Sequence, residues 1–170
     1  MDSPPRPHGP VLLVAGAYAV LLALVGLWPE HVDSGLGLVD QPFVRTLAEL
    51  LTVAPAQLVS VGEVLANLFL FVPVGVFVAY GWPKAHLPGA VIVAFAIALV
   101  IETIQWVAPI DRTASAVDLV VNAAGGCLGF AAVRAVRHHP RAQWLVLGGL
   151  ALIVLGVAAV LVWGLTVSLV

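Results

Sequence analysis

The sequence predicts an all-α fold, a polytopic integral membrane bundle of about five transmembrane helices. Hydrophobic residues make up 62% of the chain and charged residues only 9%, whereas soluble domains carry about 25% charged residues. The apolar residues also occur in long runs instead of the periodic stripes of a surface helix. Lipid is therefore expected to cover most of these side chains.

Several apolar runs approach or exceed the roughly 20 residues that a helix needs to cross a bilayer. They are residues 11–28, 62–82, 88–107, 116–136 and 144–169. The first run is too long for the apolar part of a secretory signal and has no small-x-small cleavage site, so we expect an uncleaved helix. The proline-rich residues 1–10 before it are expected to form a disordered tail.

Residues 30–60 form a polar connection that we expect to be an external loop. Within it, Phe43, Val44, Leu47, Leu50 and Leu51 repeat at helical spacing, which predicts an interfacial amphipathic helix. The expected organisation is thus a four-helix membrane domain over 11–137, followed over 138–170 by a basic linker and an additional C-terminal transmembrane helix.

The orientation follows from the basic residues in short loops, which remain on the cytoplasmic side. If the N-terminus is cytoplasmic, only Arg45 and Arg112 lie outside. The cytoplasmic segments then hold Arg6, Lys84, Arg134, Arg137 and Arg141. This assignment predicts an external C-terminus, provided that the fifth helix spans the membrane.

Polar residues interrupt three of the apolar runs in pairs spaced three or four apart, and each pair lies on one helix face. The pairs are Glu63 with Asn67, Glu102 with Gln105, and Asp118 with Asn122, and Arg112 lies in the turn between the last two helices concerned. A charge at the centre of a membrane helix costs about 2.5–3.5 kcal/mol on insertion scales. The pairs are therefore expected to face an interior pocket that opens to the external side.

Each of these residues has a structural alternative. Glu63 lies near a helix start, where a carboxylate can complement the helix dipole. Asn67, Gln105 and Asn122 can serve as interhelical hydrogen-bonding groups. Glu102, Asp118 and Arg112 are the stronger functional candidates, although an ion pair of Arg112 with either carboxylate would also lock the fold. Gly125-xxx-Gly129 is typical of close helix packing.

Familiar hydrolytic and nucleotide motifs, including Gly-x-Ser-x-Gly, His-Glu-x-x-His and a phosphate loop, do not occur in the sequence. No basic patch suited to nucleic acid is present. Cys127 has no second cysteine to pair with. His138 and His139 lie beside arginines, where headgroup contact is expected instead of metal ligation. We expect no cofactor and no metal.

The polar positions and the residues around them resemble the VanZ-like family. The segments that carry the resemblance are 67–75 (Asn-Leu-Phe-Leu-Phe-Val-Pro-Val-Gly), 101–105 (Ile-Glu-Thr-Ile-Gln), Arg112, 118–122 (Asp-Leu-Val-Val-Asn) and 125–129 (Gly-Gly-Cys-Leu-Gly). It covers about residues 10–137. It implies a multi-pass protein of the bacterial cytoplasmic membrane and a contribution to resistance against the glycopeptide teicoplanin.

The expected partners are membrane lipids and an envelope lipid precursor or lipoglycopeptide held in the outward-facing pocket. Arg112, Asn67, Gln105, Asn122 and Glu63 are the candidate ligand-binding residues. An alternative is an intramembrane enzyme acting on a lipid-linked substrate, with Glu102 and Asp118 as acid and base. A transporter or flippase is less well supported, because the polar groups gather on one side and no pair of broken helices marks a midplane site.

Overall fold

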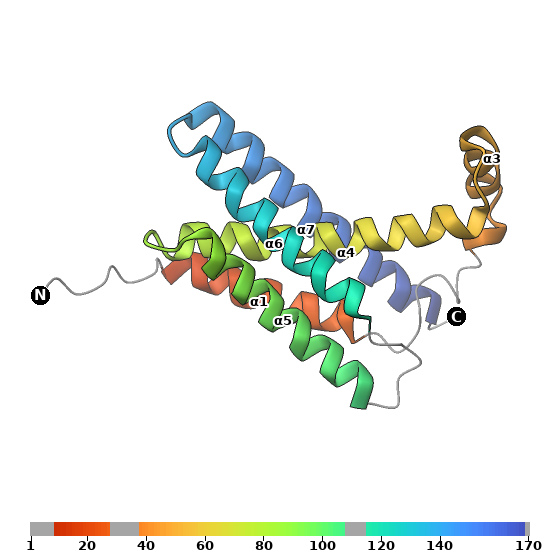
Figure 1. The fold of residues 1–170 in the computed structure, drawn as a ribbon, viewed down its shortest axis with the longest axis horizontal. Helices are drawn as coiled ribbons and strands as arrows, with labels where there is room; N and C mark the ends of the chain where they lie inside the picture. The colour runs from red at the N-terminus through yellow and green to blue at the C-terminus, as the bar shows by residue number, and fades with distance from the viewer. Residues whose placement is uncertain (1–8, 28–37, 108–114, 169–170) are drawn as a thin grey trace, which may run out of the picture.

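The computed structural model describes residues 9–27, 38–107 and 115–168, and these residues form helices and no strand. In chain order the elements are α1 (Gly9–Gly26), the short 3-10 helix η1 (Leu38–Asp40), α3 (Pro42–Leu51), α4 (Pro55–Gly81), α5 (Leu87–Val107), α6 (Ala116–Val136) and α7 (Pro140–Ser168), as Figure 1 shows. The predicted all-α fold is confirmed.

Four helices, α4 to α7, are long and apolar enough to cross a membrane. At a rise of about 1.5 Å per residue, even a 21-residue helix extends over roughly 30 Å, the thickness of the hydrocarbon core. Helix α1 adds a shorter apolar stretch, Val11–Gly26. The protein is therefore a multi-pass integral membrane protein, as the composition predicted.

The helix bounds follow the apolar runs except at the starts of α4 and α7. Helix α6 covers the expected residues, but α4 begins at Pro55 and not at Gly62, and α7 begins at Pro140, within the expected basic linker, and not at Trp144. Proline is favourable at the first position of a helix, and the Gln57 Oε1 atom accepts a hydrogen bond of 3.1 Å from the Ala54 N–H group. Residues 55–60 of the expected loop thus belong to α4. Of the expected N-terminal tail, Gly9 and Pro10 lie in α1, and residues 1–8 are outside the described residues.

Helix α6 packs against both α4 and α5 through small residues. A side chain at Gly125 or Gly129 would collide with the backbone carbonyl of Leu68 or Val72 on α4, and one at Gly126 would collide with Ala94 on α5. The backbones of α4 and α6 are therefore in direct contact. The predicted packing role of the small-xxx-small motif is confirmed.

Helix α1 is joined to this core by a tyrosine. The Tyr18 hydroxyl donates a hydrogen bond of 2.6 Å to the Leu70 carbonyl, and its ring lies 5.7 Å from that of Phe77. Tyr18 and Leu22 are both buried. Helix α7 lies on the outside of the bundle, and none of its residues with described side chains is buried.

The helices alternate in direction, so the turns gather at two ends (Figure 1). The start of α1, the turn between α4 and α5, and the turn between α6 and α7 share one end. The start of α4, the end of α5 and the start of α6 share the other, where α3 projects across the axis of α4 (Figure 1). We call the first the basic end, defined by Lys84, His86, Arg134, Arg137, His138, His139 and Arg141, and the second the opposite end.

Candidate functional site

Glu102 lies buried near the end of α5, against the start of α6. Its side chain is 8% exposed, and its Oε2 atom accepts a hydrogen bond of 2.7 Å from the Ser115 N–H group. Ser115 is the N-cap of α6, and its Oγ atom accepts from the Val117 N–H group. The carboxylate therefore lies at the positive end of the α6 dipole and satisfies one of the first N–H groups.

Gln105 connects the same face of α5 to the end of α1. Its Nε2 atom donates a hydrogen bond of 2.6 Å to the Gly26 carbonyl, and its side chain is 7% exposed. The Gln105 amide thus forms a hydrogen bond between two membrane helices, which is the structural role considered for it from the sequence. The contact places the C-terminal ends of α1 and α5 together.

Asn122 and Asp118 lie one helical turn apart on α6. Asn122 is buried, and its Oδ1 atom has no hydrogen-bond partner among the described residues. Asp118 is half-buried. Helices α5 and α6 run antiparallel, and Gly126 of α6 faces Ala94 of α5. Asp118 lies about two turns before Gly126, and Glu102 lies about two turns after Ala94, so the two carboxylates are at the same level of the bundle.

Glu63 and Asn67 face a different space, a groove of about 650 Å³. Glu63 is exposed and Asn67 is half-buried. Among the described residues that line the groove, they are the only polar ones. The other lining residues are Val25 of α1, Leu38 of η1, Phe43, Val44 and Leu47 of α3, Leu58, Val59, Gly62, Ala66, Phe69 and Leu70 of α4, and Leu152, Ile153, Gly156, Val157 and Val160 of α7.

The predicted site residues thus occupy two settings at the opposite end. Glu102, Gln105 and Asn122 are buried at helix contacts, whereas Glu63 and Asn67 line the groove. Arg112 lies outside the described residues. The acid–base role of Glu102 and Asp118 stays a prediction.

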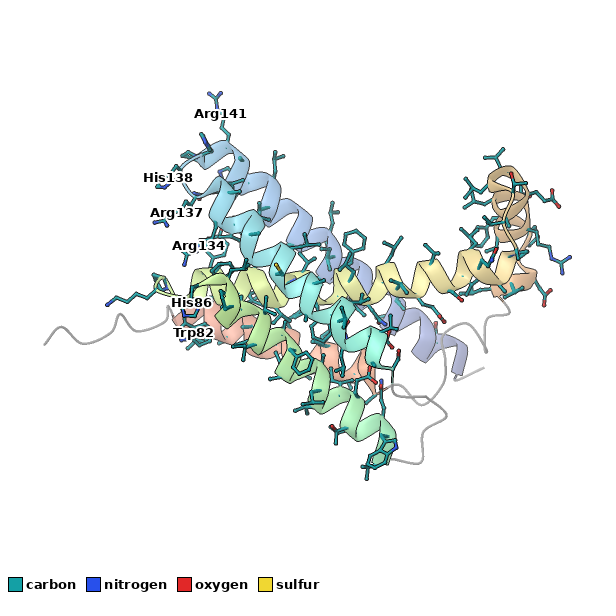
Figure 2. All side chains as sticks on the ribbon, viewed as in Figure 1. Trp82, His86, Arg134, Arg137, His138 and Arg141 are labelled. Carbon is teal, nitrogen blue, oxygen red and sulfur yellow. The ribbon has the colours of Figure 1, made fainter. Side chains whose placement is uncertain are left out.

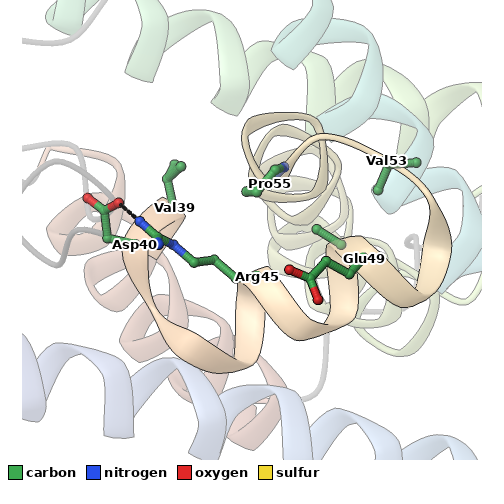
Figure 3. A pocket seen from close by; sticks show the side chains of 7 residues that line it. Val39, Asp40, Arg45, Glu49, Val53 and Pro55 are labelled. Carbon is green, nitrogen blue, oxygen red and sulfur yellow. Dashed lines mark hydrogen bonds and ion pairs between the residues drawn. The ribbon is translucent and has the colours of Figure 1, made fainter.

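A smaller hollow lies beside α3, between η1 and the start of α4 (Figure 3). Arg45 pairs there with Asp40 at 2.6 Å, and the rest of the wall is formed by Val39, Ala48, Glu49, Val53 and Pro55. Both charged side chains are more than half exposed, and such pairs contribute about 0–1 kcal/mol. The pair joins η1 to α3 and carries little of the stability.

With this geometry in view, comparison with known proteins gives one decisive result: the family model VanZ/LLP1 matches residues 15–137. The chain belongs to the VanZ/LLP1 family. No curated protein and no solved structure gave a match. The resemblance predicted from the polar positions is confirmed.

The VanZ/LLP1 match ends before α7 begins at Pro140. The groove is therefore lined by helices of the matched region and by a helix that follows it. Sequence reasoning did not find the contribution of α7, because its residues are apolar throughout the region concerned. Leu152, Gly156 and Val160 repeat every four residues, which marks one face of α7 but does not indicate what that face contacts.

Proposed function

We propose that this VanZ/LLP1 protein binds an amphipathic envelope molecule, with a long hydrocarbon chain held in the groove between α3, α4 and α7. A lipid-linked cell-wall precursor and a lipoglycopeptide share this chemistry. The observation that carries the proposal is the apolar groove with a carboxylate and an amide in its wall. Its volume falls within the range of about 300–1,000 Å³ typical of ligand pockets.

The lining of the groove supports a ligand that enters from the bilayer. Phe43, Val44 and Leu47 form one wall on α3, and Leu152 to Val160 form another on α7. Within the membrane, such apolar walls are expected to contact the hydrocarbon chain of a ligand. Lipid chains are already concentrated there, so the ligand needs no aqueous route.

The polar pair supports a ligand that also carries a headgroup. Asn67 offers a hydrogen-bond donor and an acceptor, and Glu63 offers a carboxylate one turn away. Polar side chains in an otherwise apolar pocket fix orientation and specificity. We infer that they contact the amide or hydroxyl groups next to the hydrocarbon chain, and that sequestering such a molecule contributes to glycopeptide resistance.

Filling the groove tests the proposal. Gly156 lines the groove, and a Cβ atom there would meet no atom within 4 Å. We therefore expect the ring in Gly156→Phe to extend into the groove. We expect photo-crosslinking of the purified full chain to a lipid-linked precursor, with the photoreactive group on its hydrocarbon chain, to weaken about tenfold, equal to about 1.4 kcal/mol.

Gly148→Phe is the matched control, because Gly148 lies on the same helix in open space and is not part of the groove wall. A second arm replaces the precursor by a lipoglycopeptide and by a glycopeptide without an acyl chain. Crosslinking that is equal in Gly156→Phe and Gly148→Phe would overturn the proposal. Resistance measured in cells carrying the same two variants tests the link to glycopeptides.

A further inference from the structure

Apart from Arg45, which pairs with Asp40 at the opposite end, the charges of the described residues are segregated between the two ends of the bundle. Lys84, Arg134, Arg137 and Arg141 lie at the basic end, and Figure 2 shows the three arginines along that end with His86 and His138. The acidic residues of the described segments, namely Asp40, Glu49, Glu63, Glu102 and Asp118, belong to the opposite end. Among the described residues, the basic end therefore carries positive charge with no acidic residue beside it.

Arg134 holds the two turns of the basic end together. Its guanidinium donates hydrogen bonds of 3.1 Å to the Pro83 carbonyl and 2.5 Å to the Ala85 carbonyl, and it stacks 5.0 Å from the Phe130 ring centre. The Gln143 Nε2 atom closes the second turn by donating to the Arg137 carbonyl at 2.8 Å. The remaining basic side chains are thereby presented from a fixed backbone.

Those remaining side chains face outward. Lys84, Arg137 and Arg141 are exposed, and the structure gives them no acidic partner among the described residues. Exposed tryptophans accompany them, with Trp82 at 46% and Trp144 at 73% exposure. Tryptophan is enriched where membrane helices meet the headgroup layer, so Trp82 and Trp144 favour a position of this cluster at the depth of lipid phosphates.

We propose that the basic end binds the headgroups of anionic phospholipids, with Lys84, Arg137 and Arg141 contacting headgroup phosphates. Guanidinium groups bind phosphate oxygens in a bidentate geometry. Basic clusters beside a membrane helix attract anionic lipid by a factor of about five per residue. This site lies at the end away from the groove and is independent of the molecule that the groove binds.

Binding of defined lipids to the full chain in neutral detergent tests the proposal. Phosphatidylglycerol and phosphatidylcholine with the same acyl chains are titrated separately, and bound lipid is counted by native mass spectrometry. We expect phosphatidylglycerol to bind about 100-fold more tightly, because three basic residues contribute about fivefold each. The double variant Arg137→Gln with Arg141→Gln should lose about 25-fold of that affinity.

Arg45→Gln is the matched control, since Arg45 lies at the opposite end and already pairs with Asp40; its affinity for phosphatidylglycerol should equal that of the parent. Lys84→Gln, which changes one exposed side chain in a turn, replaces the double variant if the latter does not fold, with a loss of about fivefold. Equal binding of the two lipids, or unchanged affinity in the substituted protein, would overturn the proposal. Displacement of phosphatidylglycerol by millimolar inorganic phosphate would overturn it as well, by showing a site for the free anion.

Discussion

Gln105 joins two helices that are far apart in the sequence through one hydrogen bond. The amide is buried and its acceptor is the carbonyl of Gly26. A lone bond of this kind in a membrane protein contributes about 0.6 kcal/mol on average and up to about 1.7 kcal/mol. The contact therefore stabilises the position of α1 without dominating the fold.

Replacing Gln105 by leucine should lower the free energy of unfolding by about 1 kcal/mol, because the side-chain volume is nearly kept while the bond to Gly26 is lost. The measurement is a denaturation curve of the purified protein in detergent. Thr103→Val is the control, since the Thr103 hydroxyl is exposed and bonds only to the Leu99 carbonyl of its own helix. A Gln105→Leu protein as stable as the control would contradict this account.

The spacing of polar residues in the sequence predicted their burial. It did not predict their hydrogen-bond partners. Glu102, Gln105 and Asn122 are buried as the cost of exposing them to lipid predicted. The Ser115 N–H group was not foreseen as a partner of Glu102, because a backbone donor is not marked by any residue type in the sequence. Glu63 and Asn67 share one face as expected, but the space in front of that face is set by α3 and α7.

The contact between α4 and α6 depends on glycine at defined positions. A Cβ atom at Gly129 would overlap the Val72 carbonyl, which belongs to the backbone and cannot rotate away. We predict that Gly129→Ala lowers the free energy of unfolding by about 1–3 kcal/mol, the usual cost of overpacking. Denaturation in detergent measures the loss.

Gly148→Ala is the control for Gly129→Ala, because it should leave the free energy of unfolding unchanged or raise it. Gly148 lies within α7, and a side chain there meets nothing within 4 Å. Alanine has the higher helix propensity, by up to about 1 kcal/mol, so this variant should be as stable as the parent or more stable. Equal losses in both variants would show that backbone flexibility, and not the α4–α6 contact, explains the effect.

Most helix bounds were predictable because long apolar runs in lipid have few alternatives to a helix. The amphipathic segment after η1 was also predictable, and α3 covers it from Pro42 to Leu51. The start of α4 was not, since residues 55–60 were assigned to the end of the polar connection that begins at residue 30. Proline at the first helical position and the Gln57 side chain made the earlier start favourable.

The segregation of charge over the whole molecule leads to a prediction about its orientation. Basic loops remain cytoplasmic, so the basic end should face the cytoplasm and α3 should lie outside. In a Cys127→Ala background, Thr46→Cys introduces a thiol on exposed α3, and His139→Cys introduces one at the basic end. A membrane-impermeant maleimide should label the first in intact cells and the second only after permeabilisation; the reverse pattern would invert the topology.

The direct backbone contact between α4 and α6 has a consequence for how the protein is made. The two helices are separated along the chain by α5, so α4 leaves the ribosome before its principal neighbour exists. At about 5–20 residues per second, α6 is completed seconds later. During that interval the glycine-facing surface of α4, including Gly75 and the Leu68 and Val72 carbonyls, lacks the helix that covers it in the finished protein. Until α6 arrives, lipid chains or the insertion machinery must therefore cover this surface, and α6 must later displace them.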